Sequence, residues 1–343
     1  MRILVTGGAG FIGSNLVRHL LRQHPEDQVV NLDLLTYAGN LENLADIESD
    51  PRYRFVRGDI ADRASLEGLF AASGFDAVVN CAAQTHVDRS IGDPGAFAHT
   101  NVVGTGALLE AAASFGVRRF LQVSTDEVYG SLGADGVFRE DSPLQPSSPY
   151  AASKAGGDLL ALSYFTTYRL PVVVTRCSNN YGPYQFPEKV IPLFVTNALD
   201  DQPLPLYGDG LNVRDWIHVQ DHCDAIDLAL RHGRAGEVYN VGAACERTNR
   251  AVTEAILAEL GKPASLIRLV ADRPGHDRRY AIDAAKIGGE LGWAPRTEFS
   301  AGLRETIAWY RTNRAWWQHI KTGEYRGYYE SMYGERLRAA EAR

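Results

Sequence analysis

A glycine-rich loop near the amino end constrains the fold of this chain of 343 residues more than any other feature. The segment ILVTGGAGFIGSNLV places Gly7, Gly10 and Gly13 between an apolar stretch over 2–6 and a helical pattern over 14–23. In a strand–turn–helix unit, the first glycine permits a tight turn, the second lets a pyrophosphate approach the backbone, and the third lets helix and strand pack closely. Free N–H groups at the start of the helix would face the phosphates. The loop therefore predicts a dinucleotide-binding unit.

An acidic residue at the end of the second predicted strand indicates which dinucleotide is bound. Asp33 lies twenty residues after Gly13, where a carboxylate can bind the hydroxyls of the adenosine ribose. Its charge would repel a 2′-phosphate, so the pattern favours NAD over NADP. Asp59, at the end of the third predicted strand, suits an adenine contact, although a simple strand-end turn explains its position equally well.

Short apolar segments alternate with helical patterns through the first half of the chain. Strands separated by helices pair in parallel through right-handed crossovers. We therefore expect residues 1–178 to form an α/β domain of the Rossmann type, with a doubly wound parallel sheet. Helical patterns lie between the strands, for example over 14–23 and 101–116. The predicted strands are rich in valine and cover residues 2–6, 28–33, 54–59, 76–82, 119–125 and 171–176.

After about residue 177 this alternation ends, and proline and aromatic residues become frequent. We expect residues 179–330 to form mainly a smaller, irregular α/β lobe that binds the substrate. Two short pieces, near 213–217 and 237–241, could return to the sheet of the first lobe. Residues 331–343 are charged and rich in alanine, which predicts a frayed helical tail. Helical patterns in this half recur near 218–231, 248–260 and 299–312.

Composition excludes several classes of partner. The net charge is −7, which favours neither nucleic acid nor an anionic membrane. No apolar run approaches the roughly 18 residues of a membrane span, and the start of the chain lacks the cleavage site of a signal peptide. The four cysteines form no CxxC pair, so we expect reduced thiols in the cytoplasm and no metal site. They are Cys81, Cys177, Cys223 and Cys245.

A tyrosine and a lysine share one face of a predicted helix. In SSPYAASKAGGDLL, Ser148 suits the N-cap position and Pro149 the first helical position. Tyr150 and Lys154 are then four residues apart and lie on the same face. A lysine there can bind the nicotinamide ribose and lower the pKa of the phenol, which would make Tyr150 a usable base. A surface Tyr–Lys pair on an amphipathic helix is the alternative.

The segment LQVSTDEVYG starts like a buried strand and then places three polar residues in a row. Leu121 and Val123 suit a buried strand, whereas Thr125, Asp126 and Glu127 do not. Adjacent acids at a strand end can reach different parts of one substrate and transfer protons to and from it. A strand-end cap or salt bridges would explain the same residues without chemistry.

The glycine loop combined with the YxxxK motif resembles the extended short-chain dehydrogenase/reductase family. In that family a hydroxyl residue about two dozen positions before the tyrosine assists it, and Thr125 lies at that place. The run STDEVYG, together with DLLTYAGNLENL, THVDRSI, NNYGPYQFPEKVIP, LPLYGDGLNVRDWIHV and RPGHDRRYAID, is similar to the dTDP-glucose 4,6-dehydratases of this family. Gln84 and Thr85 depart from the usual residues before HVDRS, and Thr85 keeps the hydroxyl.

This resemblance implies a reaction in which the sugar loses water. Tyr150, activated by Lys154, takes the O4 proton while the C4 hydride passes to NAD, and Thr125 binds near O4. Oxidation at C4 makes the C5 proton acidic, so that Glu127 removes it and Asp126 protonates the departing C6 hydroxyl. The hydride then returns to C6 and C5 is reprotonated, which gives dTDP-4-keto-6-deoxyglucose and regenerates a tightly bound NAD.

The resemblance also implies the binding residues. Two of the cofactor residues, Tyr150 and Lys154, are also catalytic, and Thr125 is shared between catalysis and substrate binding. The cofactor set is Gly7, Gly10, Phe11, Ile12, Gly13, Asp33, Leu34, Thr36, Asp59, Ile60, Cys81, Ala82, Ala83, Thr100, Tyr150, Lys154 and Asn180. The substrate set is Thr85, Thr125, Asn179, Glu188, Lys189, Pro205, Tyr207, Arg214, Asn249, His276 and Tyr280.

Other activities of the same fold stay open at this point. They are a sugar-nucleotide 4-epimerase, a decarboxylase, and a dehydratase acting on a CDP- or GDP-sugar. The acids at 126 and 127 disfavour the epimerase, and Asp33 disfavours the NADP-using GDP-mannose enzymes. A binding module without activity would not need all five catalytic residues. The apolar helices predicted over 97–115 and from Pro149 onward suggest a homodimer, since the family usually pairs through two such helices.

Overall fold

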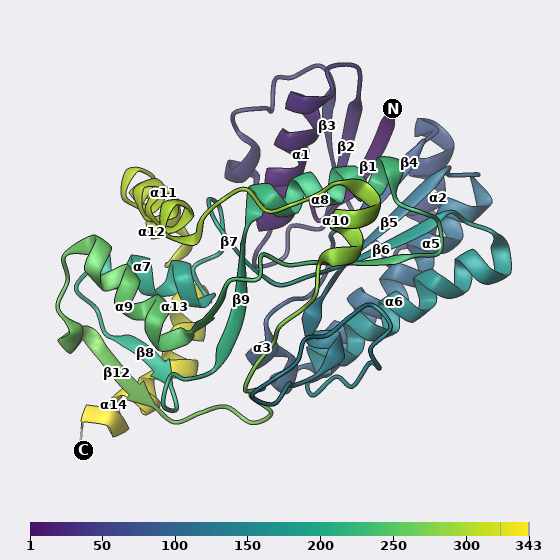
Figure 1. Cartoon of the computed structure of the whole chain (residues 1–343). Helices are drawn as coiled ribbons and strands as arrows, with labels where there is room; N and C mark the ends of the chain where they lie inside the picture. The colour runs from purple at the N-terminus through teal and green to yellow at the C-terminus, as the bar shows by residue number, and fades with distance from the viewer. Residues whose placement is uncertain (323, 342–343) are drawn as a thin grey trace.

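The computed structural model describes residues 1–322 and 324–341, and a seven-stranded parallel sheet forms its centre (Figure 1). The strand order is β10-β6-β5-β4-β1-β2-β3, which is the order of a doubly wound Rossmann sheet with one strand added beside β6. The predicted fold class is confirmed. The strands are β1 (Arg2–Thr6), β2 (Gln28–Asp33), β3 (Tyr53–Arg57), β4 (Ala77–Asn80), β5 (Arg119–Thr125), β6 (Val172–Cys177) and β10 (Val238–Val241).

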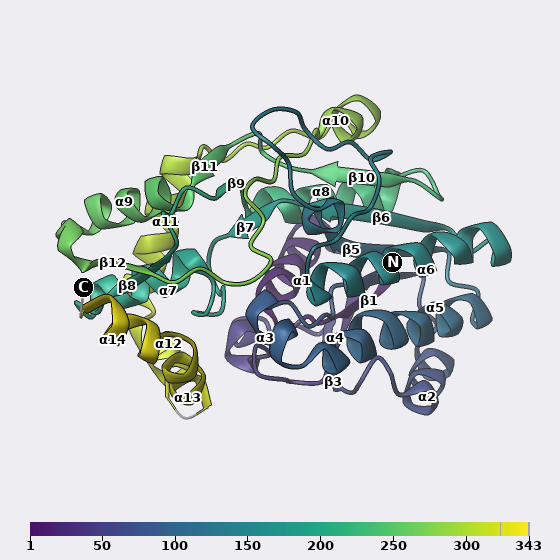
Figure 2. The same ribbon diagram turned by 90° about the horizontal axis from the view of Figure 1, so that it is seen from below.

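Helices cover both faces of this sheet, because its strands carry apolar side chains on both sides. On one face Leu16 and Ile226, from α1 and α8, are fully buried against the strands. On the other face Phe70, Leu108 and Ala161, from α2, α5 and α6, are almost completely buried (Figures 1 and 2). The covering helices are α1 (Phe11–Gln23), α2 (Arg63–Ser73), α5 (Thr105–Ser114), α6 (Pro149–Tyr168), α8 (Val219–His232) and α10 (Ala285–Leu291).

Short helical turns occupy the connections at the carboxyl edge of the sheet. The helix predicted over 101–116 begins earlier and contains a π-helical segment that runs directly into α5. The strands predicted to reach 59 and 82 end two residues sooner, at Arg57 and Asn80, where the chain turns toward the site. The turns are η1 (Leu41–Leu44), α3 (Val87–Gly92), α4 (Pro94–Ala98), η2 (His99–Gly104) and η3 (Asp126–Tyr129).

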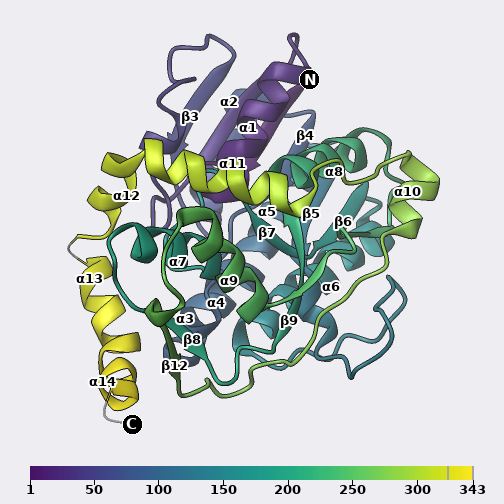
Figure 3. The same cartoon turned by 60° about the vertical axis from the view of Figure 1, so that its left-hand side comes forward.

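A smaller lobe lies beyond the carboxyl ends of the strands (Figure 3). Its core contains Phe194, Trp216 and Trp317, packed between helices and two small sheets. In the described ranges, no helix combines the length and apolar character needed to cross a membrane. The elements are β7 (Asn179–Tyr181), α7 (Val190–Leu199), β8 (Leu204–Tyr207), β9 (Val213–His218), β11 (Glu246–Thr248), α9 (Asn249–Leu260), η4 (Ala264–Leu266), β12 (Ile267–Val270), α11 (Phe299–Thr312), α12 (Arg314–Ile320), α13 (Glu324–Tyr329), η5 (Glu330–Gly334) and α14 (Glu335–Glu341).

The two pieces predicted to return to the large sheet behave differently. The piece near 237–241 does return, since β10 pairs with β6 in parallel. The piece near 213–217 does not, and that prediction is wrong, because β9 pairs with β7 and β11 in a separate three-stranded sheet. The edge of β6 accepts one further strand, and β10 occupies it. The division of the chain into domains stays a prediction.

The C-terminal segment is helical, as predicted, but it packs against the smaller lobe and is not a frayed tail. From residue 324 to 341 it is helical throughout, and residues 342–343 lie outside the described residues. Tyr333 is only 5% exposed and packs in the core of the smaller lobe. Its ring centroid lies 6.0 Å from that of Tyr207, so this segment belongs to the packed structure.

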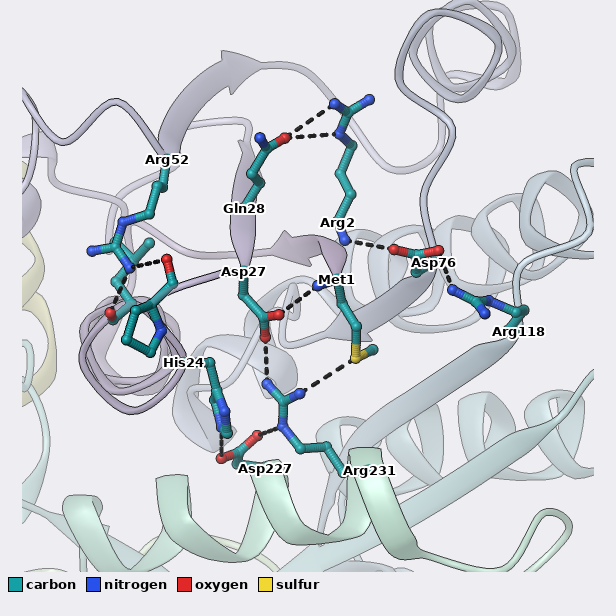
Figure 4. Close-up of polar contacts among 12 residues, drawn as sticks. Met1, Arg2, His24, Asp27, Gln28, Arg52, Asp76, Arg118, Asp227 and Arg231 are labelled. Carbon is teal, nitrogen blue, oxygen red and sulfur yellow. Dashed lines mark hydrogen bonds and ion pairs between the residues drawn. The ribbon is translucent and has the colours of Figure 1, made fainter.

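A network of charged side chains ties α8 to the amino ends of β1 and β2 (Figure 4). Arg231 binds Asp27 on one side and Asp227 on the other, and its Nε lies 2.6 Å from Asp227 Oδ1. His24 Nε2 lies 2.6 Å from Asp227 Oδ2. This network lies at the amino edge of the sheet, opposite the edge where Rossmann folds bind ligands, so it stabilises the fold without taking part in the site.

A second charged pair lies wholly inside the first lobe and gives a stability prediction. Arg176 Nε donates to Asp158 Oδ2 at 3.0 Å, and both side chains are at most 3% exposed. An Arg176→Met variant would leave a buried carboxylate unpaired, so the free energy of unfolding should fall by about 3–5 kcal/mol. Urea unfolding followed by circular dichroism measures the change. An Arg176→Met/Asp158→Leu double variant should recover part of the loss, and a single-variant loss below about 1 kcal/mol would contradict the prediction.

Candidate active site

A cavity of about 380 Å³ opens at the carboxyl edge of the large sheet and extends into the smaller lobe. This edge is where Rossmann folds bind their ligands. All residues predicted to bind the cofactor line the cavity, as do the five predicted catalytic residues. Of the predicted substrate residues, Pro205 alone is not among those lining it in the described part of the chain. Pro205 lies inside β8, one strand repeat (about 6.6 Å) before Tyr207.

The glycine loop packs so closely against neighbouring backbone that two of its glycines leave no room for a Cβ atom. Gly7 has φ +67°, and a Cβ there would lie 2.7 Å from Ala82 Cα. A Cβ on Gly13 would lie 2.2 Å from the carbonyl oxygen of Gly7. Helix α1 begins after Gly10, which provides no side-chain cap for the first N–H groups. These free donors line a cavity and fit the pyrophosphate of a dinucleotide.

The close packing at Gly13 predicts the effect of one added methyl group. Gly13→Ala should shift the loop and weaken NAD binding by about 5- to 150-fold, because overpacking a tight site costs about 1–3 kcal/mol. NAD content of the purified protein and the dissociation constant of the NAD-stripped protein measure this. Gly289→Ala is the matched control, since a Cβ there would meet nothing within 4 Å. Equal NAD affinity in both variants would contradict the prediction.

Asp33 lies where an adenosine ribose would be bound. Its carboxylate accepts hydrogen bonds from the backbone N–H groups of Ala9 (2.9 Å) and Leu35 (2.8 Å), which hold it in the cavity wall. Burial raises its pKa, and the two backbone hydrogen bonds oppose this rise. Asp59 also lines the cavity, and its Oδ1 accepts from Ala61 N at 2.8 Å, so the strand-end turn considered for Asp59 is present.

The end of β5 places a hydroxyl and two acids in the cavity. Thr125 is extended and caps the 3₁₀ turn that follows, since Glu127 N donates to Thr125 Oγ1 at 3.3 Å. The threonine hydroxyl in turn donates to Asp126 Oδ1 at 3.3 Å. Asp126 Oδ2 is buried and has no hydrogen-bond partner within the described chain. The change from strand to 3₁₀ turn therefore directs successive side chains to different parts of the cavity wall.

The two acids have different electrostatic surroundings. Burial raises the pKa of Asp126 well above its ordinary value, and the neighbouring charges of Glu127 and Asp215 raise it further. Burial also raises the pKa of Glu127, but the cations of Arg273 and Lys189 oppose this rise. Asp126 is thus favoured as a protonated acid, whereas Glu127 keeps its charge more easily. This difference in protonation is what a general acid and a general base acting on one substrate require.

Helix α6 brings the tyrosine and the lysine to the same cavity. Ser148 caps the helix by accepting from Ala151 N, and Pro149 opens it, as predicted. The expectation that Lys154 lowers the pKa of Tyr150 is not met. Burial raises the pKa of Tyr150 well above its ordinary value, and the charge of Glu127 raises it further. Lys154 Nζ instead donates to the Val123 carbonyl oxygen at 2.7 Å.

The part of the cavity in the smaller lobe is rich in cations and aromatic rings. Arg214 is 5% exposed, its guanidinium carbon lies 4.3 Å from the Tyr280 ring centroid, and Nη2 donates to the Asp277 carbonyl oxygen at 2.9 Å. His276 Nδ1 lies 2.6 Å from Asp272 Oδ1, and burial lowers the His276 pKa to about 4. A neutral imidazole therefore lines this part of the cavity at neutral pH. Asn249 also lines it.

The segment that follows Phe186 also lines the cavity. Glu188 accepts from the Tyr37 hydroxyl at 3.0 Å and from Arg89 Nε at 3.1 Å, so both of its carboxylate oxygens have partners. Lys189 Nζ donates to the Thr85 carbonyl oxygen at 2.7 Å. The structure thus brings the predicted Thr85, Glu188 and Lys189 together with Asn179 along one wall.

Several lining residues were not predicted from the sequence. Arg273 and Asp88 form an ion pair across the two lobes, with Arg273 Nη1 3.2 Å from Asp88 Oδ1. Both belong to motifs that the sequence had singled out, RPGHDRRY and THVDRSI, so their density of charge was a usable signal. Tyr333 also lines the cavity, and nothing in its local sequence indicated this.

Comparison with known proteins identifies the family. The model of the GDP-mannose 4,6-dehydratase family matches residues 4–306. The chain belongs to this family. Proteins that are similar over nearly the full length of the chain have a more specific activity in their names. A dTDP-glucose 4,6-dehydratase of Actinoplanes sp. is 58% identical over 322 residues, which are 92% of this chain and 100% of the relative. One of Neisseria meningitidis is 53% identical over 95% of this chain and 97% of its own.

Solved structures of similar proteins have the same fold. The dTDP-glucose 4,6-dehydratase DesIV of Streptomyces venezuelae, with NAD and TYD bound, superimposes with a TM-score of 0.91 at 56% identity, and the match covers 94% of this chain and 100% of DesIV. A UDP-glucose 4-epimerase of Thermotoga maritima with UDP-glucose has a TM-score of 0.86 at 31% identity, covering 92% and 100%. Since both activities occur on this fold, the residues of the site must distinguish them.

Proposed function

We propose that the protein is an NAD-dependent dTDP-glucose 4,6-dehydratase that forms dTDP-4-keto-6-deoxyglucose and water. The observation that carries the proposal is the Asp126–Glu127 pair, which shares one cavity with Thr125, Tyr150 and Lys154. A 4-epimerase needs a hydroxyl and a tyrosine at C4 but has no C–O bond to break. The dTDP-glucose 4,6-dehydratases that are 53–58% identical over most of the chain support the same function.

The residues around the glycine loop fit NAD. Added Cβ atoms on Gly7 and Gly13 would collide with the neighbouring backbone and distort the loop, and the carboxylate of Asp33 would repel a 2′-phosphate. NAD, when bound, accepts the hydride from C4 of the sugar and returns it to C6. Tyr150 takes the O4 proton, Lys154 lines the same cavity from the same helix, and Thr125 orients the O4 hydroxyl.

Glu127 and Asp126 carry out the elimination of water. Glu127 removes the C5 proton, which oxidation at C4 has made acidic, and C5 is reprotonated once the hydride has reached C6. Asp126, whose pKa is raised well above its ordinary value by burial and by its acidic neighbours, gives its proton to the C6 hydroxyl as water leaves. In the smaller lobe, the Arg214 cation suits the diphosphate, and Asn249, His276, Tyr280 and Tyr207, which line the same cavity, would surround the nucleoside.

The direct test is incubation of the purified protein with dTDP-glucose and no added NAD. Formation of a 4-keto-6-deoxy sugar, detected by its alkali-induced absorbance, is the expected result. UDP-, CDP- and GDP-sugars run in parallel report on the nucleotide. Signal from another nucleotide alone would keep the mechanism and change the substrate, whereas no signal from any of them with NAD supplied would overturn the proposal.

We further propose that the enzyme is a cytoplasmic homodimer, which the four free cysteines and the exposed apolar residues of η2 and α6 support. Val103 is 53% exposed and Leu159 58% exposed, and such residues on adjacent helices suit a helix-pairing interface. Light scattering should give twice the chain mass of 37.6 kDa. Leu159→Glu should yield monomers, because it buries a charge, and Leu211→Glu, at a 43% exposed position, is the control. A monomeric wild-type mass would refute the homodimer.

A further inference from the structure

The hydroxyl of Tyr207 has partners on two elements that are far apart in the sequence. It accepts a hydrogen bond from Arg336 Nη1 at 2.7 Å and lies 3.2 Å from Asp88 Oδ2. Arginine only donates and a carboxylate only accepts, so the phenol proton must point to Asp88. Burial raises the pKa of Tyr207 to about 12, which keeps the phenol neutral and able to donate at neutral pH.

These contacts fix Tyr207 from both lobes. Asp88 lies in α3 and is held by Arg273, whose Nη1 is 3.2 Å from Asp88 Oδ1. Arg336 lies in α14, and its guanidinium carbon is 5.1 Å from the centroid of the Tyr207 ring. The Tyr207 hydroxyl thus has a partner in each lobe, and Tyr207 lines the cavity.

Two further rings complete an aromatic slot around Tyr207. The Tyr333 centroid lies 6.0 Å from it with the planes tilted by 34°, and the His276 centroid lies 6.0 Å from it at 81°. All three residues line the cavity, at the end that also contains Arg214 and Arg273. Cations suit a diphosphate and aromatic faces suit a base, so this slot fits the base of the nucleotide.

We infer that Arg336, on the C-terminal helix α14, is a positioning residue for the nucleotide base: it holds the Tyr207 ring in place as one wall of a slot that Tyr333 and His276 flank. This inference rests on the proposed function and deepens it, since it assigns recognition of the base to a segment outside the lobe that carries the chemistry. Arg336 acts through Tyr207 and has no part in the transfer of protons or hydride.

The test is the binding of dTDP to the full-length NAD-containing protein, measured by calorimetry. Arg336→Met should raise the dissociation constant of dTDP about tenfold, the factor expected for one lost hydrogen bond. It should leave the inhibition constant of inorganic pyrophosphate within about twofold, because pyrophosphate has no base. In turnover of dTDP-glucose, KM should rise with dTDP affinity while kcat changes by less than about twofold.

Matched variants separate this role from a general effect on folding. Arg338→Met changes an exposed arginine of α14, which pairs with Glu330 at the surface, and should bind dTDP like the wild type. Arg336→Lys keeps a donor and should restore most of the affinity, which also keeps the test usable if Arg336→Met does not fold. In a Tyr207→Phe background, Arg336→Met should raise the dissociation constant of dTDP by less than about a further twofold, because the two residues act as a unit.

Failure of the proposed function and failure of the role of Arg336 would give different results. A wild-type protein that neither binds dTDP nor dehydrates dTDP-glucose would overturn the proposed function. A wild-type protein that does both, with Arg336→Met binding dTDP equally well, would overturn only the role of Arg336. The same conclusion would follow if Arg336→Met weakened pyrophosphate as much as dTDP, lowered kcat without raising KM, or had its full effect in the Tyr207→Phe background.

Discussion

A Tyr150→Phe variant should lose about 10²- to 10⁴-fold in turnover of dTDP-glucose, because it removes the group that takes the O4 proton. The ring stays in place against Phe97, so the protein should fold and keep its NAD. The alkali-induced absorbance of the 4-keto-6-deoxy product measures the loss. Tyr168→Phe is the control on the same helix, since Tyr168 is 63% exposed and should be dispensable.

Two other outcomes for Tyr150→Phe would change the interpretation. Turnover equal to that of the wild type would show that the phenol is not the base. Turnover lost together with NAD would show that the variant damaged the cofactor site, because Tyr150 and Lys154 both line it. In that case a Lys154→Met variant with NAD retained would provide the separate test of the pair.

Variants of the two acids should stop the reaction at different points. Asp126→Asn cannot protonate the C6 hydroxyl, so dehydration should fall by about 10²- to 10⁴-fold. The C5 proton should still exchange with solvent, since Glu127 is intact. Glu127→Gln should lose dehydration by a similar factor and lose the exchange as well, because no base remains at C5.

Deuterium incorporation into recovered dTDP-glucose distinguishes these two variants. The sugar is incubated with each variant in deuterated water, and the label at C5 is measured by mass spectrometry. We expect label with Asp126→Asn and none with Glu127→Gln. The reverse pattern would exchange the two roles, and label with neither variant would mean that loss of the C5 proton and loss of water occur in one step. Glu290→Gln, on α10 outside the cavity lining, is the control.

The sequence predicted the first lobe well because its signals are local. The glycine loop, Asp33 at the end of β2, and the cap at Ser148 each depend on residues close together in the chain, and each lies where it was expected. A buried parallel strand is a short valine-rich run bounded by turn residues, which is visible in the sequence. The smaller lobe was predicted less well, because its strands pair with partners that no local pattern specifies, as β9 illustrates.

The protonation of the site could not be predicted either. The spacing of Tyr150 and Lys154 suggested a phenol with a lowered pKa, but a pKa depends on burial and on charges from other elements. In the folded chain, burial and Glu127 raise the pKa of Tyr150, and Lys154 binds the Val123 carbonyl. The opposing effects on Asp126 and Glu127 likewise come from Asp215, Arg273 and Lys189, which are distant in the sequence.

By itself the sequence determined the Rossmann lobe, the choice of NAD, and the residue types that can dehydrate a sugar. Each follows from residues a few positions apart, whose geometry the backbone of a strand, turn or helix sets. Only the tertiary structure decided that the C-terminal segment contributes to the wall of the cavity. Tyr333 and Arg336 reach Tyr207 from more than a hundred residues away. Such contacts form only when distant parts of the chain fold against each other, so no periodicity in the sequence predicts them.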